Sequence, residues 1–382
     1  MTKKGRSDFK LYVELSETLE EGLPSGLTDT QRTDCLLQKL REANLLTAIS
    51  PYDAGGLGLS TKEIVTIIFN VSKVSGSVGL IYSMHLSQLL CLIHHSKEST
   101  YLNEQLKTIT KNQQLIASAT SEIVANGDIF GSHCTIVQAG SSLSLSKETP
   151  NISYANLAEV FLITALENTG KKPRQRLILS EAENTHLTSI RENKMMGMKG
   201  IVNHAYQVEA TFSKEALFDE PFAVIARDTM TPATHLFWAA SWSGIAANAI
   251  TKAKNYIRRE MKSADTQVKH EMDIKLSEMV NSHYIMNALI REALSIWSQD
   301  DSSALGFSAA AVFNRLKVIC SESVNRICYE ALSICGLRGY AEGGPYSLSE
   351  QIRDAMSAPI MVSNFRLIHN TAAIEQFINE TP

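Results

Sequence analysis

The spacing of apolar residues changes twice along this chain, and this change limits the folds that it can adopt. From Phe9 to about Asn112 the apolar residues recur at helical spacing. From Leu115 to Phe222 they alternate in short segments rich in β-branched and aromatic residues, with turn residues between them. After Pro232 the helical spacing returns and continues almost to the C-terminus. The sequence therefore predicts a mostly α-helical fold with a central β-barrel or sandwich domain.

The predicted boundaries give an N-terminal helical domain, a central β domain and a C-terminal helical bundle, at residues 1–113, 114–225 and 226–382. A chain of 382 residues is long enough for two or three packed units. In the first domain, Ser60 and Glu63 have the spacing of a capping box, which predicts a helix start. In the third, Leu236–Ile257 and Ile274–Trp297 are long enough for the helices of a bundle.

Composition and charge exclude several classes of protein. The 36 basic and 40 acidic residues give a formal net charge of −4, which provides no electrostatic footprint for nucleic acid. The most apolar window, Val78–Ile93, contains polar residues and predicts a buried helix instead of a membrane span. The basic N-terminus is not followed by an unbroken apolar run, so a secretory signal is not supported. The six cysteines have neither C-x-x-C nor zinc-site spacing, so we expect reduced thiols, no metal site and a cytoplasmic protein.

The stretch from Cys335 to Asn370 combines a glycine turn with the start of another helix. The glycines follow an apolar helical run, and Pro345 and an Arg-Asp-Ala segment come after them. Glycines that let a backbone approach another group closely, followed by a cation and a helix start, suit a large cofactor that carries phosphates. The alternative is a helix C-cap followed by an ordinary turn. The rest of the chain must decide between these two interpretations.

Six short segments, read together with the three-part order, resemble the acyl-CoA dehydrogenase superfamily of flavoproteins along nearly the whole chain. They are Tyr52–Gly58, Ser75–Ser77, Ser121–Asp128, Gly197–Gly200, Gly336–Tyr340 and Pro345–Ala355. The resemblance implies an N-terminal helical domain, a β domain and a C-terminal four-helix bundle, with FAD as the cofactor. It also implies that the glycine segment Gly336–Tyr340 contacts the cofactor of a neighbouring subunit, so we expect a homodimer or homotetramer.

The same resemblance implies which residues bind the cofactor. Segment by segment, the matching positions are Ser121, Glu122, Ile152, Ser153, Gly336, Gly339, Ser363 and Asn364. The family carries an aromatic residue near Ile152 that is missing here, although Tyr154 is adjacent. Glu260 stands where the family has an arginine that meets the flavin pyrophosphate, with Arg258 and Arg259 close by in sequence.

The catalytic carboxylate of the family is missing at both of its usual places. Most members take the α-proton of an acyl thioester with a glutamate whose position is occupied here by Val362. Other members place the glutamate at the start of the first bundle helix, where this chain has Thr234 beside His235. Ordinary acyl-CoA β-oxidation is therefore disfavoured. We take His235 as the first candidate base, with Thr234 to position it or the substrate; the alternative is a helix-start histidine without catalytic duty.

Two kinds of enzyme in the superfamily are compatible with the missing glutamate. Flavin monooxygenases need no α-proton abstraction. The sequences of Arg353–Pro359 and Tyr256–Glu260 instead most resemble those of the acyl-carrier-protein dehydrogenases that help make hydroxymalonyl or aminomalonyl extender units for polyketides. In that chemistry the oxidised carbon already bears oxygen, so the proton leaves from a more acidic site. We expect an FAD-dependent dehydrogenase of a seryl- or glyceryl-type acyl group, with an acyl carrier protein and its phosphopantetheine arm as partner. A monooxygenase and a non-catalytic family member remain alternatives.

Overall fold

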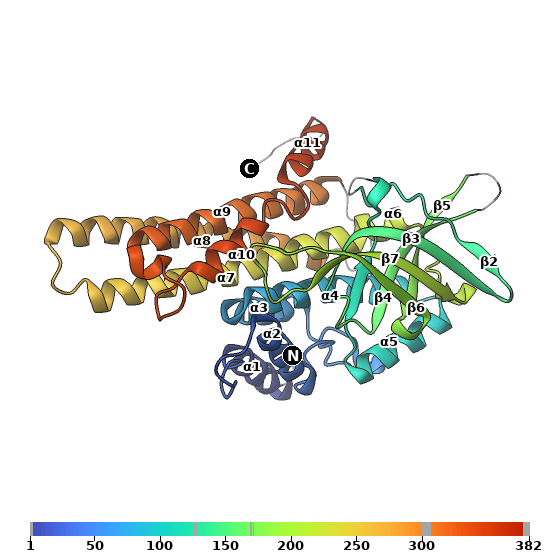
Figure 1. Cartoon of the computed structure of the whole chain (residues 1–382), viewed down its shortest axis with the longest axis horizontal. Helices are drawn as coiled ribbons and strands as arrows, with labels where there is room; N and C mark the ends of the chain where they lie inside the picture. The colour runs from blue at the N-terminus through green and yellow to red at the C-terminus, as the bar shows by residue number, and fades with distance from the viewer. Residues whose placement is uncertain (1–2, 126–127, 169, 171, 300–306, 377–382) are drawn as a thin grey trace.

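The computed structural model describes residues 3–125, 128–168, 170, 172–299 and 307–376, which form three parts in chain order (Figure 1). Asn126 and Gly127 of the predicted flavin loop lie outside the described residues. An N-terminal helical part is followed by two β-sheets, and a long helical bundle forms the rest of the chain. The bundle extends away from the sheets and gives the molecule its elongated outline.

The N-terminal part contains five helices. They are α1 (Lys3–Glu17), α2 (Asp29–Glu42), α3 (Thr61–Val74), α4 (Gly76–His95) and α5 (Thr100–Asn112), with a short 3₁₀ turn, η1, at Tyr52–Ala54. The predicted capping box is confirmed: the Ser60 hydroxyl accepts from the backbone of Glu63, and the Glu63 carboxylate accepts from the backbone of Ser60. Helix α4 is long and apolar enough to cross a membrane, but 89% of its apolar window is buried inside the protein.

The central part consists of two sheets. The first has the order β1 (Ile116–Ala119), β4 (Val160–Glu167) and β5 (Arg174–Glu181), with β1 parallel to β4. The second is antiparallel, with the order β2 (Val137–Ala139), β3 (Ser142–Ser153), β7 (Asn203–Phe212) and β6 (Thr185–Glu192). The first six residues of β4 are all buried, because this strand lies in the middle of its sheet with both faces covered. A 3₁₀ turn, η2 (Ile123–Ala125), follows β1.

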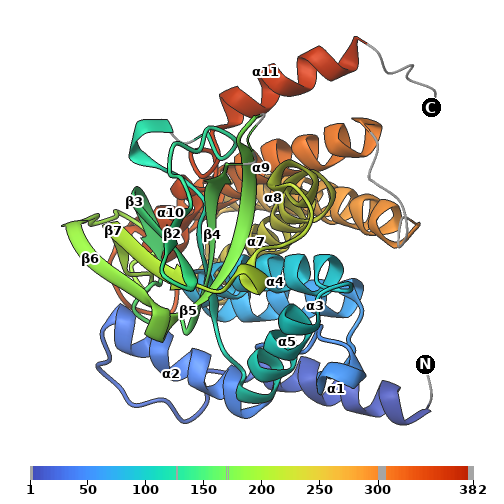
Figure 2. The ribbon, with the colours of Figure 1, turned by 90° about the vertical axis from the view of Figure 1, so that its right-hand side faces the viewer.

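The C-terminal part is a bundle of three long helices and a shorter one. The short helix α6 (Phe222–Ile225) and a π-helical turn, η5 (Ala226–Met230), lead into α7 (Thr231–Glu260), α8 (Thr266–Gln299) and α9 (Phe307–Tyr340). Helix α10 (Ser349–Ser357) packs on α9 and α7, and α11 (Asn364–Glu375) projects from the end of the bundle nearest the sheets (Figures 1 and 2). Helix α9 is interrupted at Gly336, whose φ of 55° and ψ of −138° are not helical.

Helix α7 joins the bundle to the N-terminal part. It packs on α3 and α4 on one side and on α8 and α9 on the other. The approach to α3 is close at Gly244, where an added Cβ would lie 2.3 Å from the carbonyl oxygen of Phe69. Helix α4 runs antiparallel to α7, and the Ser83 hydroxyl donates to the carbonyl oxygen of Phe237 at 3.2 Å. The residues of α7 that face this contact are therefore fixed between two domains.

Candidate functional site

The segment between α10 and α11, residues 358–364, holds two of the predicted site residues. We call this segment the 358–364 turn. Val362 and Ser363 are exposed, and Asn364 is buried at the start of α11. Lys317, on α9, donates hydrogen bonds to the carbonyl oxygens of Ala358 at 3.1 Å and Val362 at 2.6 Å, and to Oδ1 of Asn364 at 2.7 Å. The side chain of Asn364 is thus used inside the bundle, and only the turn's outer surface is free to meet a cofactor.

His235 and Thr234 lie in the second turn of α7. Thr234 is half-buried, whereas His235 is 2% exposed and lies in the interior. Its ring bonds to the backbone of Phe313 on α9, and its Nδ1 has no partner among the described residues. Burial, with the nearby ammonium of Lys317, lowers the pKa of His235 to about 3. The imidazole is therefore neutral at pH 7 and offers a hydrogen-bond acceptor.

Two tryptophans continue the same face of α7. Trp238 and Trp242 follow His235 by three and seven residues, which places all three on one stripe of the helix. Their ring centroids are 6.0 Å apart, and the Nζ of Lys317 lies 5.8 Å from the ring centroid of Trp242. In the part of the chain that the structure describes, neither indole Nε1 has a hydrogen-bond partner. This cluster was not predicted from the sequence. The signal that could have indicated it is Lys317, a lysine inside the apolar run of α9.

Glu122, a predicted cofactor residue, is turned into the β domain. Its carboxylate accepts from the Ser132 hydroxyl at 2.5 Å and from the backbone N–H groups of His133 at 2.8 Å and Cys134 at 3.2 Å, and it pairs with Lys147 at 3.3 Å. Burial raises the pKa of Glu122, but these hydrogen bonds and the Lys147 charge outweigh it and lower the pKa overall. The side chain therefore stabilises the domain, and only the backbone of this segment is left for a cofactor.

At the end of β3 the two predicted residues point to opposite sides. Ile152 is 1% exposed and packs in the core, so its side chain is not on the surface, and the cofactor contact of this segment stays a prediction. Ser153 is half-buried, and its hydroxyl donates to Oδ1 of Asn203 at 2.8 Å and accepts from Asn151 at 3.1 Å. The difference follows from the alternation of side chains along a strand, which sends neighbouring residues to opposite faces.

The predicted glycines lie at the far end of α9. Gly336 is exposed with a φ of 55°, and Gly339 is packed so that an added Cβ would lie 2.7 Å from Cβ of Cys335. Along a helix with a rise of 1.5 Å per residue, Gly336 lies roughly 28 Å from Lys317. Within one chain the glycines and the 358–364 turn are therefore separated. This separation is compatible with the expectation that the glycines serve the cofactor of a neighbouring subunit.

Glu260, at the position of the family's arginine, is engaged with its own neighbours. Its carboxylate accepts from the Tyr346 hydroxyl at 2.9 Å and forms an ion pair with Arg338 of the glycine segment. Hydrogen bonds from Tyr346 and Arg338 lower the pKa of Glu260. The carboxylate and its arginine partner thus neutralise each other beside the glycine segment.

Several exposed residues on the 358–364 turn and on η2 are of the kinds that contact a flavin ring. Val362 is 44% exposed, and Ile123 and Val124 of η2 are 40% and 66% exposed, although all three are apolar. Ser363 is exposed and Ser121 is half-buried, so hydroxyl groups lie beside these apolar side chains in sequence. Apolar side chains with flanking hydroxyls suit a flat aromatic ring with a polar edge. The residues present are therefore compatible with bound FAD.

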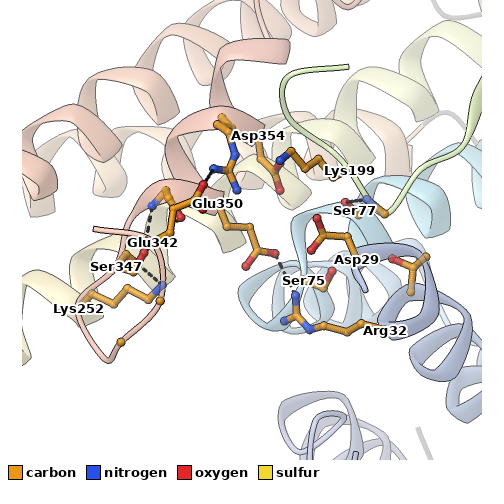
Figure 3. Close-up of a pocket in the computed structure, with 16 residues that line it drawn as sticks. Asp29, Arg32, Ser75, Ser77, Lys199, Lys252, Glu342, Ser347, Glu350 and Asp354 are labelled. Atoms are coloured by element: carbon orange, nitrogen blue, oxygen red, sulfur yellow. Dashed lines mark hydrogen bonds and ion pairs between the residues drawn. The ribbon is translucent and has the colours of Figure 1, made fainter. Parts of the chain in front are cut away.

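A polar pocket of about 430 Å³ lies where the three parts of the chain meet (Figure 3). Its charged lining is balanced and largely paired: Arg32 meets Glu350 at 3.1 Å, and Arg353 meets Glu342 at 2.9 Å. Asp354 accepts from the backbone N–H of Met198 at 2.5 Å. None of the predicted cofactor residues lines this pocket. Its lining instead contains the Ser75, Lys199 and Arg353 segments that marked the resemblance, so these segments hold the three parts together.

The chain is similar to acyl-CoA dehydrogenases in sequence and in structure. Residues 233–362 match the family model described as acyl-CoA dehydrogenase, C-terminal domain. A probable acyl-CoA dehydrogenase of Bacillus subtilis (strain 168) is 23% identical over 325 residues, which are 83% of this chain and 83% of that protein.

Solved structures of this fold align along nearly the whole chain. The acyl-CoA dehydrogenase complexed with FAD from Bacillus anthracis has a TM-score of 0.82 at 21% identity, over 97% of this chain and 68% of that one. The prolyl acyl carrier protein oxidase AnaB has a TM-score of 0.82 at 16% identity, with 100% of both chains covered. The fold that the sequence predicts is thereby confirmed.

Proposed function

We propose that this protein, a flavin-dependent member of the acyl-CoA dehydrogenase superfamily, oxidises a β-oxygenated acyl group carried by an acyl carrier protein. FAD is its cofactor and, when bound, supplies the oxidant that accepts a hydride from the substrate. The substrate class is a seryl- or glyceryl-type thioester, in which the carbon that loses hydride already bears oxygen. The product is the corresponding carbonyl compound, and the second hydrogen leaves the oxygen as a proton.

The observation that carries this proposal is the pair of side chains at the two usual glutamate positions. Val362 cannot accept a proton, and Thr234 is not a base at neutral pH. A carbon α to a thioester needs a strong, well-placed base, whereas a hydroxyl that becomes a carbonyl releases its proton as hydride departs. A site without the carboxylate therefore suits oxidation at oxygen-bearing carbon better than desaturation of an alkyl chain.

In this proposal His235 orients the substrate and does not take up its proton. A protonated imidazole would lie in the interior close to the ammonium of Lys317, and like charges in a buried site are disfavoured. In this proposal the unpartnered Nδ1, which is buried, accepts a hydrogen bond from the substrate hydroxyl once the substrate reaches the interior. Thr234 is its half-buried neighbour in sequence. The proton then passes on to water.

A carrier protein and a second copy of the chain are the proposed partners. AnaB, which has the same fold, is an acyl carrier protein oxidase by name, and this supports a carrier-bound substrate. Leu337 and Tyr340 in the glycine segment are 82% and 74% exposed, and Phe365, near the other end of α9, is 82% exposed, although a monomer gains nothing from exposing such large apolar side chains. They support a homodimer or homotetramer. The six cysteines, all free thiols, support a cytoplasmic location.

Intact-mass analysis of loaded carrier proteins tests the function. The purified holoenzyme is incubated with carrier proteins that bear seryl, glyceryl or simple acyl groups. Loss of two hydrogens from the seryl or glyceryl group is the expected result, with anaerobic reduction of the flavin by the same carrier. Gain of one oxygen would indicate a monooxygenase instead of a dehydrogenase. No mass change across the panel would contradict both activities.

A further inference from the structure

We propose that Lys317 is a positioning residue whose buried ammonium holds the 358–364 turn in a strained shape and so sets the surface that meets flavin and substrate. The proposed function supplies the reason why this surface matters. The stabilisation of the 358–364 turn by Lys317, however, can be measured without any substrate. Lys317 touches neither substrate nor cofactor in this proposal.

The turn contains a backbone conformation that its residue disfavours. Val362 has a φ of 51°, in the left-handed region. A β-branched side chain there is a clear outlier, because its Cβ substituents crowd the backbone, and such a residue costs on the order of 1–3 kcal/mol. A glycine would adopt this shape at no such cost. Other contacts must therefore stabilise Val362 in place.

The contacts that do so come from one ammonium group. Lys317 is 0% exposed, and its three hydrogen bonds to Ala358, Val362 and Asn364 match the three N–H bonds of an ammonium. The shortest, at 2.6 Å, is to the carbonyl oxygen of Val362 itself. The face of Trp242 lies beside the same cation. Among the described residues, Lys317 forms no direct ion pair, although the carboxylate of Glu322 on the same helix acts on its charge from farther away. Its hydrogen bonds go to the 358–364 turn.

The same face of α9 fixes both ends of the turn. Residues 317, 321 and 325 are spaced by four and form one stripe. The amide of Asn364 donates to the Ser321 hydroxyl at 3.0 Å and to the exposed Glu322 carboxylate at 3.2 Å. Asn325 donates to the carbonyl oxygen of Ala355 at 2.7 Å. Lys317 is thus the first residue of a polar stripe that anchors the chain from Ala355 to Asn364.

Two consequences follow for the chemistry of the site. The carbonyl of Val362 is turned inward to Lys317, so the exposed Val362 side chain and Ser363 form the outer surface of the turn. Burial lowers the pKa of His235, and the ammonium of Lys317 lowers it further, so the imidazole stays neutral. The buried ammonium therefore contacts the turn directly and adds to the effect of burial on the neighbouring α7 residue.

The test compares Lys317→Met with a matched control, Lys252→Met, in the FAD-loaded full chain. Lys252 is also partly buried in the bundle and donates to the carbonyl oxygen of Ser347 at 2.6 Å and to Oε1 of Gln351 at 2.9 Å, but it does not contact the turn. We expect Lys317→Met to increase amide hydrogen exchange in residues 358–364 at least tenfold and to lower kcat more than tenfold. Lys252→Met should leave exchange in this segment within twofold of the parent.

A second comparison, made in a protein that carries Val362→Gly, separates relief of backbone strain at Val362 from a general loss of order in the turn. Val362→Gly removes the strain, so adding Lys317→Met to it should increase exchange in the turn less than threefold. An equal increase in both backgrounds, or no change with Lys317→Met alone, would overturn the proposal. If Lys317→Met does not fold, Lys317→Gln is measured instead, with the same expected direction. Exchange requires no substrate, so a wrong substrate class would leave this result intact.

Discussion

Three bulky residues of this protein have a left-handed backbone: Tyr154, Met198 and Val362, with φ of 47°, 52° and 51°. Each is tied down by a hydrogen bond across a long stretch of sequence. The N–H of Tyr154 donates to Val202 at 2.8 Å, and that of Met198 to Asp354 at 2.5 Å, while Val362 accepts from Lys317 at 2.6 Å. Strained residues persist only where the surroundings over-determine them. These three positions therefore mark where separate segments are locked together.

His235→Gln tests the residue proposed to orient the substrate. Because the pKa of His235 is lowered to about 3, its imidazole does not titrate between pH 5.5 and 8 and cannot produce a pH limb there. We expect His235→Gln to bind FAD and to lower kcat by about 10- to 100-fold with an unchanged pH profile. Steady-state rates across this pH range measure both. Full turnover by this variant, or a limb near pH 6 that it abolishes, would contradict the assigned role.

Asp354 predicts a pH dependence of stability. Burial raises the pKa of this carboxyl to about 7, so the folded protein holds the proton more tightly than the unfolded chain does. The protonated carboxyl therefore stabilises the folded state fully below about pH 4, and this stabilisation is lost as the pH rises to about 7. Over this range we expect the free energy of unfolding to decrease on the order of a few kcal/mol. Denaturant titrations should show a smaller decrease for Asp354→Asn. Asp273→Asn, at an exposed carboxyl on α8 that does not act on Asp354, is the control and should keep the slope.

At the scale of elements, α7 is the helix on which the fold depends. It packs on α3 and α4 on one side and contacts α9 through His235 and Trp242, so it lies between the N-terminal part and the helix that holds the 358–364 turn. The hydroxyls of Ser72 on α3 and Ser241 on α7 lie 2.9 Å apart. Such close packing leaves no room for a larger residue at the crossing.

Gly244→Ala tests this crossing. An added Cβ would lie 2.3 Å from the carbonyl oxygen of Phe69, which is backbone and cannot rotate away. Overpacking of this kind costs about 1–3 kcal/mol, or more where the helices must separate. The midpoint of urea unfolding should fall accordingly. Thr251→Ala, on the exposed side of the same helix, should change the stability by no more than about 0.5 kcal/mol.

At the scale of the whole molecule, the apolar surface of the bundle is the unusual feature. Leu337 and Tyr340 lie in the glycine segment at one end of the bundle, Ile360 lies in the 358–364 turn, and Phe365 follows that turn. A second copy of the chain that covered these residues would bring another subunit next to both parts of the candidate cofactor site. FAD retention and assembly would then be linked, since a ligand shared between subunits stabilises the oligomer.

Leu337→Arg tests this linkage. A charge at this 82% exposed position should dissociate the oligomer, because a charged residue at the centre of an apolar interface is desolvated without a partner. Light scattering on a sizing column should show a smaller species, and FAD should be lost in parallel. Leu11→Arg, at a 59% exposed position of α1, is the control and should change neither property. A parent protein that is monomeric with tightly bound FAD would contradict the prediction.

The order of helices and strands could be predicted from the sequence because it depends on local spacing. A helix or strand imposes its period on the residues that it buries, and the capping box of α3 is complete within four residues. The segments that resemble the acyl-CoA dehydrogenases could be found for the same reason, since each is short and continuous. The resemblance also placed Val362 and Thr234 at the family's two glutamate positions without any structure, and this placement stays a prediction.

The roles of single side chains at the site were decided by tertiary packing. Lys317 and Val362 are 45 residues apart, and Lys147 lies 25 residues beyond Glu122, so local spacing carried no sign of either contact. Ile152 was predicted to meet the cofactor and is buried, because the packing of the two sheets decides which face of β3 turns inward. Burial and charge depend on what surrounds a group in space. The chain's periodicity determined the fold, and only the packing of its distant segments decided which side chains are free to act.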